Sequence, residues 1–168
     1  MNLLRGLPTV CAVAFLAGCA TTSQRVIIEP VTPVPTAGES KEAGYLKVYS
    51  YGVQLGDYDV AVPTPSDYSI FSSDGKLLQR VDNSAGRASG GPILVSLPQG
   101  SYSIQAEAEC SGPVTVPIAI TAQRVTVVHL DHGCRAKAPK SGVTNLIRLP
   151  DRRLVGWIQV TEPPAGTR

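Results

Sequence analysis

The sequence lacks the periodicity of amphipathic helices, because its apolar residues nowhere recur at helical spacing for more than about two turns. It also lacks basic blocks and any alternation of basic with aromatic residues. Its 15 Lys and Arg residues stand against 13 Asp and Glu residues, which gives a formal net charge of only +2. This charge pattern argues against a nucleic-acid partner.

Motifs of common catalytic sites are missing as well. Ser89 has neighbouring glycines at the wrong spacing for the nucleophile elbow of hydrolases. Gly90-Gly91 is not followed by the Lys-Ser or Lys-Thr of a phosphate-binding loop. Glu107 and Glu109 are expected on one face of a strand, where they keep that face solvated. We therefore predict that the protein is not an enzyme and that it has no cofactor.

One segment contains several residue types that bind metals: His129, Asp131, His132 and Cys134. Zinc needs three or four ligands that converge at ~2.0–2.3 Å. If the segment is a strand, His129 and Asp131 share one face and His132 points to the other, while Cys134 is expected in a disulfide. The pattern therefore predicts a solvated strand end and no metal site. An enzyme based on this cluster is the weakest function hypothesis.

Turn-forming residues are abundant, with 16 Gly and 14 Pro residues spread among segments of Val, Ile, Tyr and Thr. Such a composition is typical of short strands joined by many turns, and we predict an all-β domain. Strands are expected at residues 45–51, 67–71, 76–81, 93–97, 101–108, 114–120, 124–131, 145–149 and 154–160.

Several turns define the expected hairpins. The turn from Ser72 to Gly75 should join the second and third strands, with the glycine in a left-handed conformation. Pro98-Gln99-Gly100 should join the fourth and fifth strands into the clearest hairpin of the chain. Residues 150–153 should join the last two strands. Residues 52–65 are expected to be a long connection.

Four cysteines are present, of which Cys11 and Cys19 lie in the N-terminal segment. Cys110 and Cys134 form an even pair, and in an oxidising compartment we expect them to form a disulfide. Closing a loop of about 25 residues would stabilise the fold by roughly 3 kcal/mol in the chain-entropy model. Two free thiols or a metal site are the alternatives.

The N-terminal segment has the parts of an export signal. Arg5 is the only charged residue before Cys19, and the apolar run from Leu7 to Leu16 is, at ~10 residues, too short to cross ~30 Å of hydrocarbon as a helix. Leu16-Ala17-Gly18-Cys19 resembles the bacterial lipoprotein signal at every position. The resemblance implies that residues 1–18 are a cleaved signal peptide and that the Cys19 thiol carries a diacylglycerol. An ordinary secretory signal is the alternative.

The lipoprotein resemblance also implies a location. Ala20 stands where an aspartate would retain a lipoprotein in the inner membrane of a two-membrane bacterium, so we expect an outer-membrane anchor and a domain that faces the periplasm. Residues 19–44 contain several prolines and are expected to form an extended tether that reaches up to ~70 Å. An edge strand at residues 26–28 is the alternative for part of this segment.

Short motifs recur in order through the predicted strands: Tyr-x-Ile-Phe-x-x-Asp-Gly-Lys at residues 68–76, Val-Ser-Leu-Pro-x-Gly-x-Tyr-x-Ile at 95–104 and Val-x-Val-Pro-Ile at 114–118. Together they resemble transthyretin-like domains, which include carboxypeptidase regulatory-like domains, and the whole chain is similar to uncharacterised bacterial lipoproteins that carry such a domain. The resemblance implies a β-sandwich over residues 45–134, with Tyr102 filling its core. Residues 135–168 are expected to add a loop, a β-hairpin and a tail.

These features favour a lipid-anchored envelope protein with a structural or protein-interaction role, bound to the membrane through Cys19. The alternative is a glycan- or peptidoglycan-binding module that stacks sugars on Tyr49, Tyr51, Tyr58 and Trp157. That function requires these aromatic side chains to be exposed in one row. Trp157, the single tryptophan, is rather expected to be a packing residue that caps the core or docks the last hairpin.

Overall fold

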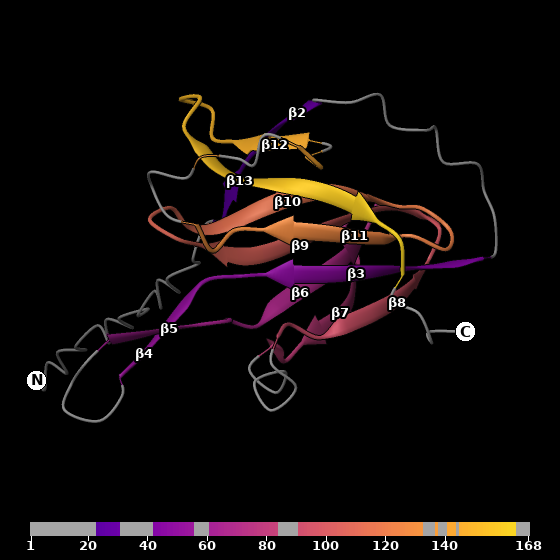
Figure 1. The fold of residues 1–168 in the computed structure, drawn as a ribbon, viewed down its shortest axis with the longest axis horizontal. Helices are drawn as coiled ribbons and strands as arrows, with labels where there is room; N and C mark the ends of the chain where they lie inside the picture. The colour runs from indigo at the N-terminus through magenta and orange to yellow at the C-terminus, as the bar shows by residue number, and fades with distance from the viewer. Residues whose placement is uncertain are drawn as a thin grey trace, which may run out of the picture.

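The computed structural model describes residues 23–30, 42–55, 61–83, 91–132, 137, 141–143 and 145–163. Their regular structure consists of strands, with no α-helix in this part of the chain (Figure 1). The predicted all-β class is therefore confirmed. Among the described residues, no helix is long and apolar enough to cross a membrane.

Most strands belong to two mixed sheets that pack against each other. The five-stranded sheet has the order β1 (Gln24–Arg25), β10 (Gly112–Ile120), β9 (Gly100–Ala108), β6 (Tyr68–Ser72) and β7 (Leu77–Val81). The six-stranded sheet has the order β2 (Ile27–Pro30), β12 (Asn145–Arg148), β13 (Leu154–Thr161), β11 (Val125–His129), β3 (Ala43–Tyr49) and β8 (Leu94–Pro98). Two short strands, β4 (Gly52–Leu55) and β5 (Ala61–Thr64), form a separate ribbon.

The core lies between the two large sheets and follows from the alternation of apolar residues along their strands. In β9 and β10, Ile104 and Val116 face each other across the strand pair and are fully buried. Leu46 and Val48 of β3 contribute to the same core from the other sheet. The protein is therefore a β-sandwich with one continuous core.

The hairpin predicted at residues 93–108 is wrong. β8 pairs with β3 in the six-stranded sheet, whereas β9 pairs with β10 and β6 in the five-stranded sheet. The Pro98-Gln99-Gly100 segment is therefore a corner that carries the chain from one sheet to the other. Alternation in a sequence predicts which face of a strand is buried but not which strand it pairs with. Tyr102 is half-buried beside the core, and its hydroxyl donates to the Pro98 carbonyl at 2.9 Å.

The tether predicted for residues 19–44 is wrong for residues 24–30. β1 pairs in parallel with β10, and β2 pairs antiparallel with β12. Val26, between these two strands, is buried in the core, and Ile28 packs against it. The apolar residues of this segment therefore serve to add a strand to each sheet, as in the alternative of an edge strand. Residues 31–41 lie outside the described residues.

Two further segments differ from the sequence prediction or refine it. Residues 52–65, expected to be a connection, contain the β4–β5 ribbon, in which Val53 is paired in register with Pro63. The predicted C-terminal hairpin is present as β12 and β13. It is a part of the sandwich rather than an addition, since Ile147 and Ile158 belong to the same core as β3 and β9.

Candidate functional site

The candidate site lies on the outer face of the six-stranded sheet, at the end of β11. His129 is the last residue of β11 and faces Tyr49 on β3 and Trp157 on β13, its two neighbours in the sheet. Val128 and Leu130, on either side of His129 in sequence, belong to the core. Alternation along the strand therefore directs His129 away from the core and places its ring between two aromatic side chains.

Both neighbours of His129 in the sheet stack on its ring. The ring centroids of Tyr49 and His129 are 4.7 Å apart with an interplanar angle of 8°, and those of His129 and Trp157 are 5.1 Å apart at 25°. Trp157 is only 4% exposed and is not part of the core between the sheets. Its packing role is therefore on the outer face, against the histidines.

The chain turns back over this face directly after β11. The His132 ring lies 4.5 Å from the Trp157 ring at 7° and 5.6 Å from the His129 ring at 30°. The prediction that His132 points away from His129 and Asp131 is wrong. β11 ends at His129, so the alternation of a strand does not extend to residue 132.

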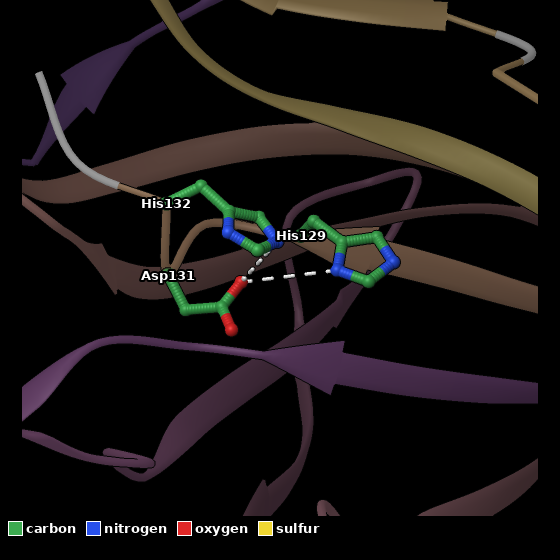
Figure 2. Close-up of side chains that lie close together, drawn as sticks. All are labelled: His129, Asp131 and His132. Carbon is green, nitrogen blue, oxygen red and sulfur yellow. Dashed lines mark ion pairs between the residues drawn. The ribbon is translucent and has the colours of Figure 1, made fainter. Parts of the chain in front are cut away.

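Figure 2 shows the two imidazole rings on one side of the Asp131 carboxylate, with one nitrogen of each ring facing the same carboxylate oxygen. Asp131 Oδ1 lies 3.8 Å from His129 Nδ1 and 3.6 Å from His132 Nε2. The side chains are 16% exposed at His129, 31% at Asp131 and 46% at His132. The three side chains offer ligand atoms that all lie within 4.8 Å of one another. We call these three residues the histidine–aspartate cluster.

Two atoms of the cluster are buried without a hydrogen-bond partner: His129 Nδ1 and Asp131 Oδ1. Their separation of 3.8 Å is too long for a hydrogen bond between them. Burying a polar atom without a partner costs ~1–3 kcal/mol. A group that bound both atoms would therefore recover this free energy.

A shallow cavity of about 150 Å³ adjoins the cluster, and its lining consists of Tyr49, Ser50, Tyr51, Thr64, Pro65 and Asp131. Asp131 therefore belongs to both the cavity wall and the cluster. Ser50 is buried beneath the cavity, where its hydroxyl accepts a hydrogen bond of 2.9 Å from the Asn83 side chain. This polar contact fixes the floor of the cavity.

Backbone contacts fix the position of the cluster. Leu130 N donates to Tyr49 O at 2.8 Å, which continues the pairing of β11 with β3 beyond the strand end. On the other side, β13 approaches so closely that a Cβ atom on Gly156 would lie 2.0 Å from His129 O. In the sequence, Gly156 next to Trp157 is a signal of this close approach that the predictions above do not include.

The four aromatic residues proposed as a sugar platform do not form an exposed row. Tyr49 and Tyr51 both line the cavity and are half-buried, whereas Trp157 is buried. Tyr58 lies outside the described residues. The structure therefore removes Trp157 from any exposed platform and leaves two tyrosines at one cavity.

Cys110 is disulfide-bonded and lies in the turn between β9 and β10, at a φ of 64°. Cys134 and the lipidation residue Cys19 lie outside the described residues. The pairing of Cys110 with Cys134 therefore stays a prediction.

Comparison with protein-family models found no match, and comparisons with curated proteins and with solved structures found none either.

Proposed function

We propose that this chain is a lipid-anchored protein of the bacterial envelope, held at the outer membrane and facing the periplasm. The observation that carries the proposal is the sequence Leu16-Ala17-Gly18-Cys19 at the end of a short apolar run. Ala20 after the cysteine supports the outer membrane over the inner one. Two or three acyl chains on Cys19 would anchor the protein durably, since each buried methylene contributes ~0.8 kcal/mol.

The position of β1 supports a short link between the lipid and the sandwich. β1 begins at Gln24, five residues after Cys19. Since an extended chain spans at most ~3.5 Å per residue, Gln24 lies within ~18 Å of the lipidated cysteine. The proposed anchor therefore holds the sandwich close to the bilayer surface, whereas a tether through residue 44 would let it move far from the surface.

Replacement of Cys19 tests the anchor. Cys19→Ser is expected to move the protein from the membrane fraction to the soluble fraction, because the serine cannot receive the thioether-linked lipid. Cys11→Ser is the matched control, since Cys11 leaves with the signal peptide, and it should fractionate as the unmodified protein does. Unchanged membrane fractionation of Cys19→Ser would contradict the proposal.

Within this setting we assign the sandwich a non-catalytic role in contact with a partner protein. β7 supports this role, because it stands at the edge of its sheet and, among the described strands, pairs with β6 alone. Leu77 and Leu78 on this strand are 42% and 48% exposed. Exposed edge strands with apolar side chains are surfaces on which another protein can add a strand.

Crosslinking in cells tests this contact. A photoreactive amino acid at Leu78 is expected to capture a specific envelope protein, which mass spectrometry identifies. The matched control carries the same amino acid at Asp151, an exposed residue in the β12–β13 turn of the other sheet. If neither position, or only the control, captured a specific partner, the proposed role of β7 would be wrong.

The transthyretin-like relationship is part of the proposal, supported by the two-sheet architecture and by the Pro98–Tyr102 hydrogen bond at the corner between the sheets. Glycan binding has less support, because Trp157 is buried. It would depend on Tyr49 and Tyr51, which share the cavity beside Asp131.

A further inference from the structure

We propose that the histidine–aspartate cluster binds a divalent transition-metal ion, with Zn²⁺ as its simplest representative. The proposed ligand atoms are His129 Nδ1, Asp131 Oδ1 and His132 Nε2. This site is independent of the lipid anchor and of the partner contact at β7.

The donor set suits such an ion. Imidazole nitrogen is the protein ligand preferred by Zn²⁺, Cu²⁺ and Ni²⁺, whereas Ca²⁺ and Mg²⁺ prefer sites made only of oxygen atoms. Two imidazoles and one carboxylate are also the protein ligands of many zinc sites that keep one position open. The residue types of the cluster therefore select a transition metal over the alkaline-earth ions.

The distances discriminate between an ion and a water molecule as the missing partner. Ligand atoms at ~2.0–2.1 Å from a tetrahedral metal lie ~3.3–3.4 Å from one another. Two atoms that share a water molecule, each at ~2.8 Å, lie ~4.6 Å apart. The two separations from Asp131 Oδ1, 3.6 Å and 3.8 Å, are closer to the metal geometry, and all three ligand atoms lie within 4.8 Å of one another. An ion would also satisfy the buried His129 Nδ1 and Asp131 Oδ1, which have no hydrogen-bond partner.

Stacking holds the imidazole rings ready for an ion. The faces of the His129 ring are taken up by Tyr49 and Trp157, and His132 stacks on Trp157. The nitrogen lone pairs lie in the plane of each ring, so the stacked faces leave them free to bind. Aromatic contacts that restrict a ligand's orientation lower the entropic cost of metal binding, because fewer rotamers are lost when the ion arrives.

The proposed site has room for a further ligand. Three protein ligands leave at least one coordination position open on zinc. Asp131 also lines the cavity of about 150 Å³ beside Tyr49 and Tyr51. A small oxygen or nitrogen donor in this cavity could therefore reach the ion, which makes the bound metal an additional point of contact for a ligand.

The site and the start of β1 lie at the same end of the sandwich. In the turn between β9 and β10, Glu109 N donates to Leu130 O at 2.9 Å, and Ser111 O accepts from the Gln24 side chain at 2.7 Å. The end of β11 and the start of β1 therefore contact the same turn. If Cys19 carries the lipid, the metal faces the membrane-proximal side. That statement of location rests on the proposed function, whereas metal binding itself does not.

Zinc titration of the full-length protein in detergent micelles, after chelator treatment, tests the proposal. Isothermal titration calorimetry is expected to show one Zn²⁺ per chain. Asp131→Asn and His132→Ala should each weaken zinc binding by about 100-fold or more, given that loss of an outer-shell contact alone costs 10–100-fold. Both residues are partly exposed, so these variants should fold, which their unfolding curves would verify.

Glu162→Gln is the matched control, because it removes one carboxylate from an exposed residue beyond the other end of β13. It should bind zinc as tightly as the unmodified protein. The proposal is overturned if the unmodified chain binds no stoichiometric zinc, which would leave water as the partner of the cluster. It is also overturned if the Asp131 and His132 variants bind zinc like the control. If zinc binding failed while Cys19 was still lipidated, the metal proposal would be wrong and the proposed envelope anchor would be unaffected.

Discussion

Strands β9 and β11 differ in how many of their faces are buried. In β9, Ile104, Ala106 and Ala108 are buried in the core, and the residues between them are only partly buried. In β11, the four residues from Val125 to Val128 are all buried. β9 therefore has one packed face and one solvated face, whereas β11 is packed on both.

The second packed face of β11 belongs to an apolar layer on the outside of the six-stranded sheet. Val125, Val127, Val143 and Trp157 are buried but are not part of the core between the sheets. A sandwich needs no such layer to close its core, since antiparallel sheets commonly leave their outer face to solvent. Trp157 of this layer stacks on both histidines of the histidine–aspartate cluster, so the cluster lies on the packed outer face.

The largest expected effect is the loss of Trp157. Trp157→Ala should reduce the free energy of unfolding by about 3–5 kcal/mol, the usual cost of truncating a buried tryptophan, because its side chain is as buried in the outer layer as a core residue. Phe71, which is half-buried on the five-stranded sheet, provides the comparison, and Phe71→Ala should cost about 1 kcal/mol. Urea unfolding of both variants measures the difference. Equal losses would mean that the outer layer packs no better than a solvated face.

A smaller effect is expected where β13 approaches β11. Gly156→Ala should cost about 1–3 kcal/mol, because its Cβ would collide with the His129 carbonyl and push the two strands apart. Gly91→Ala is the control, since its Cβ would meet only the flexible end of Lys47 at 3.6 Å. It should change stability by less than about 0.5 kcal/mol. Thermal unfolding of the two variants measures the difference. Equal unfolding temperatures would mean that the close approach of β13 to β11 does not limit the side chain at residue 156.

The sequence predicted the faces of strands better than their partners. The β6–β7 hairpin could be predicted because its turn is local: Gly75 has the left-handed conformation expected there, at a φ of 83°. The corner at Pro98–Gly100 could not, because a strand that changes sheet has the same alternation as one that forms a hairpin. The pairing of residues 24–30 also depends on contacts distant in sequence, with Val114 and Ile147 among them.

The cluster was missed for a related reason. Its residues stand out in the sequence, but the prediction of no metal site requires the strand to continue through His132. Once β11 ends at His129, the chain can return, and the stack of His132 on Trp157 draws its ring beside His129. Trp157 comes from a strand more than twenty residues later, so no local pattern indicates this contact.

Zinc K-edge X-ray absorption of the full-length protein, loaded with one equivalent of Zn²⁺, is the most direct test of the histidine–aspartate cluster as a ligand-binding site. We expect the scattering of two imidazole rings and light donor atoms at ~2.0–2.1 Å, with one imidazole lost in His132→Ala. A spectrum of hydrated zinc without imidazole scattering, or one that His132→Ala leaves unchanged, would contradict the account.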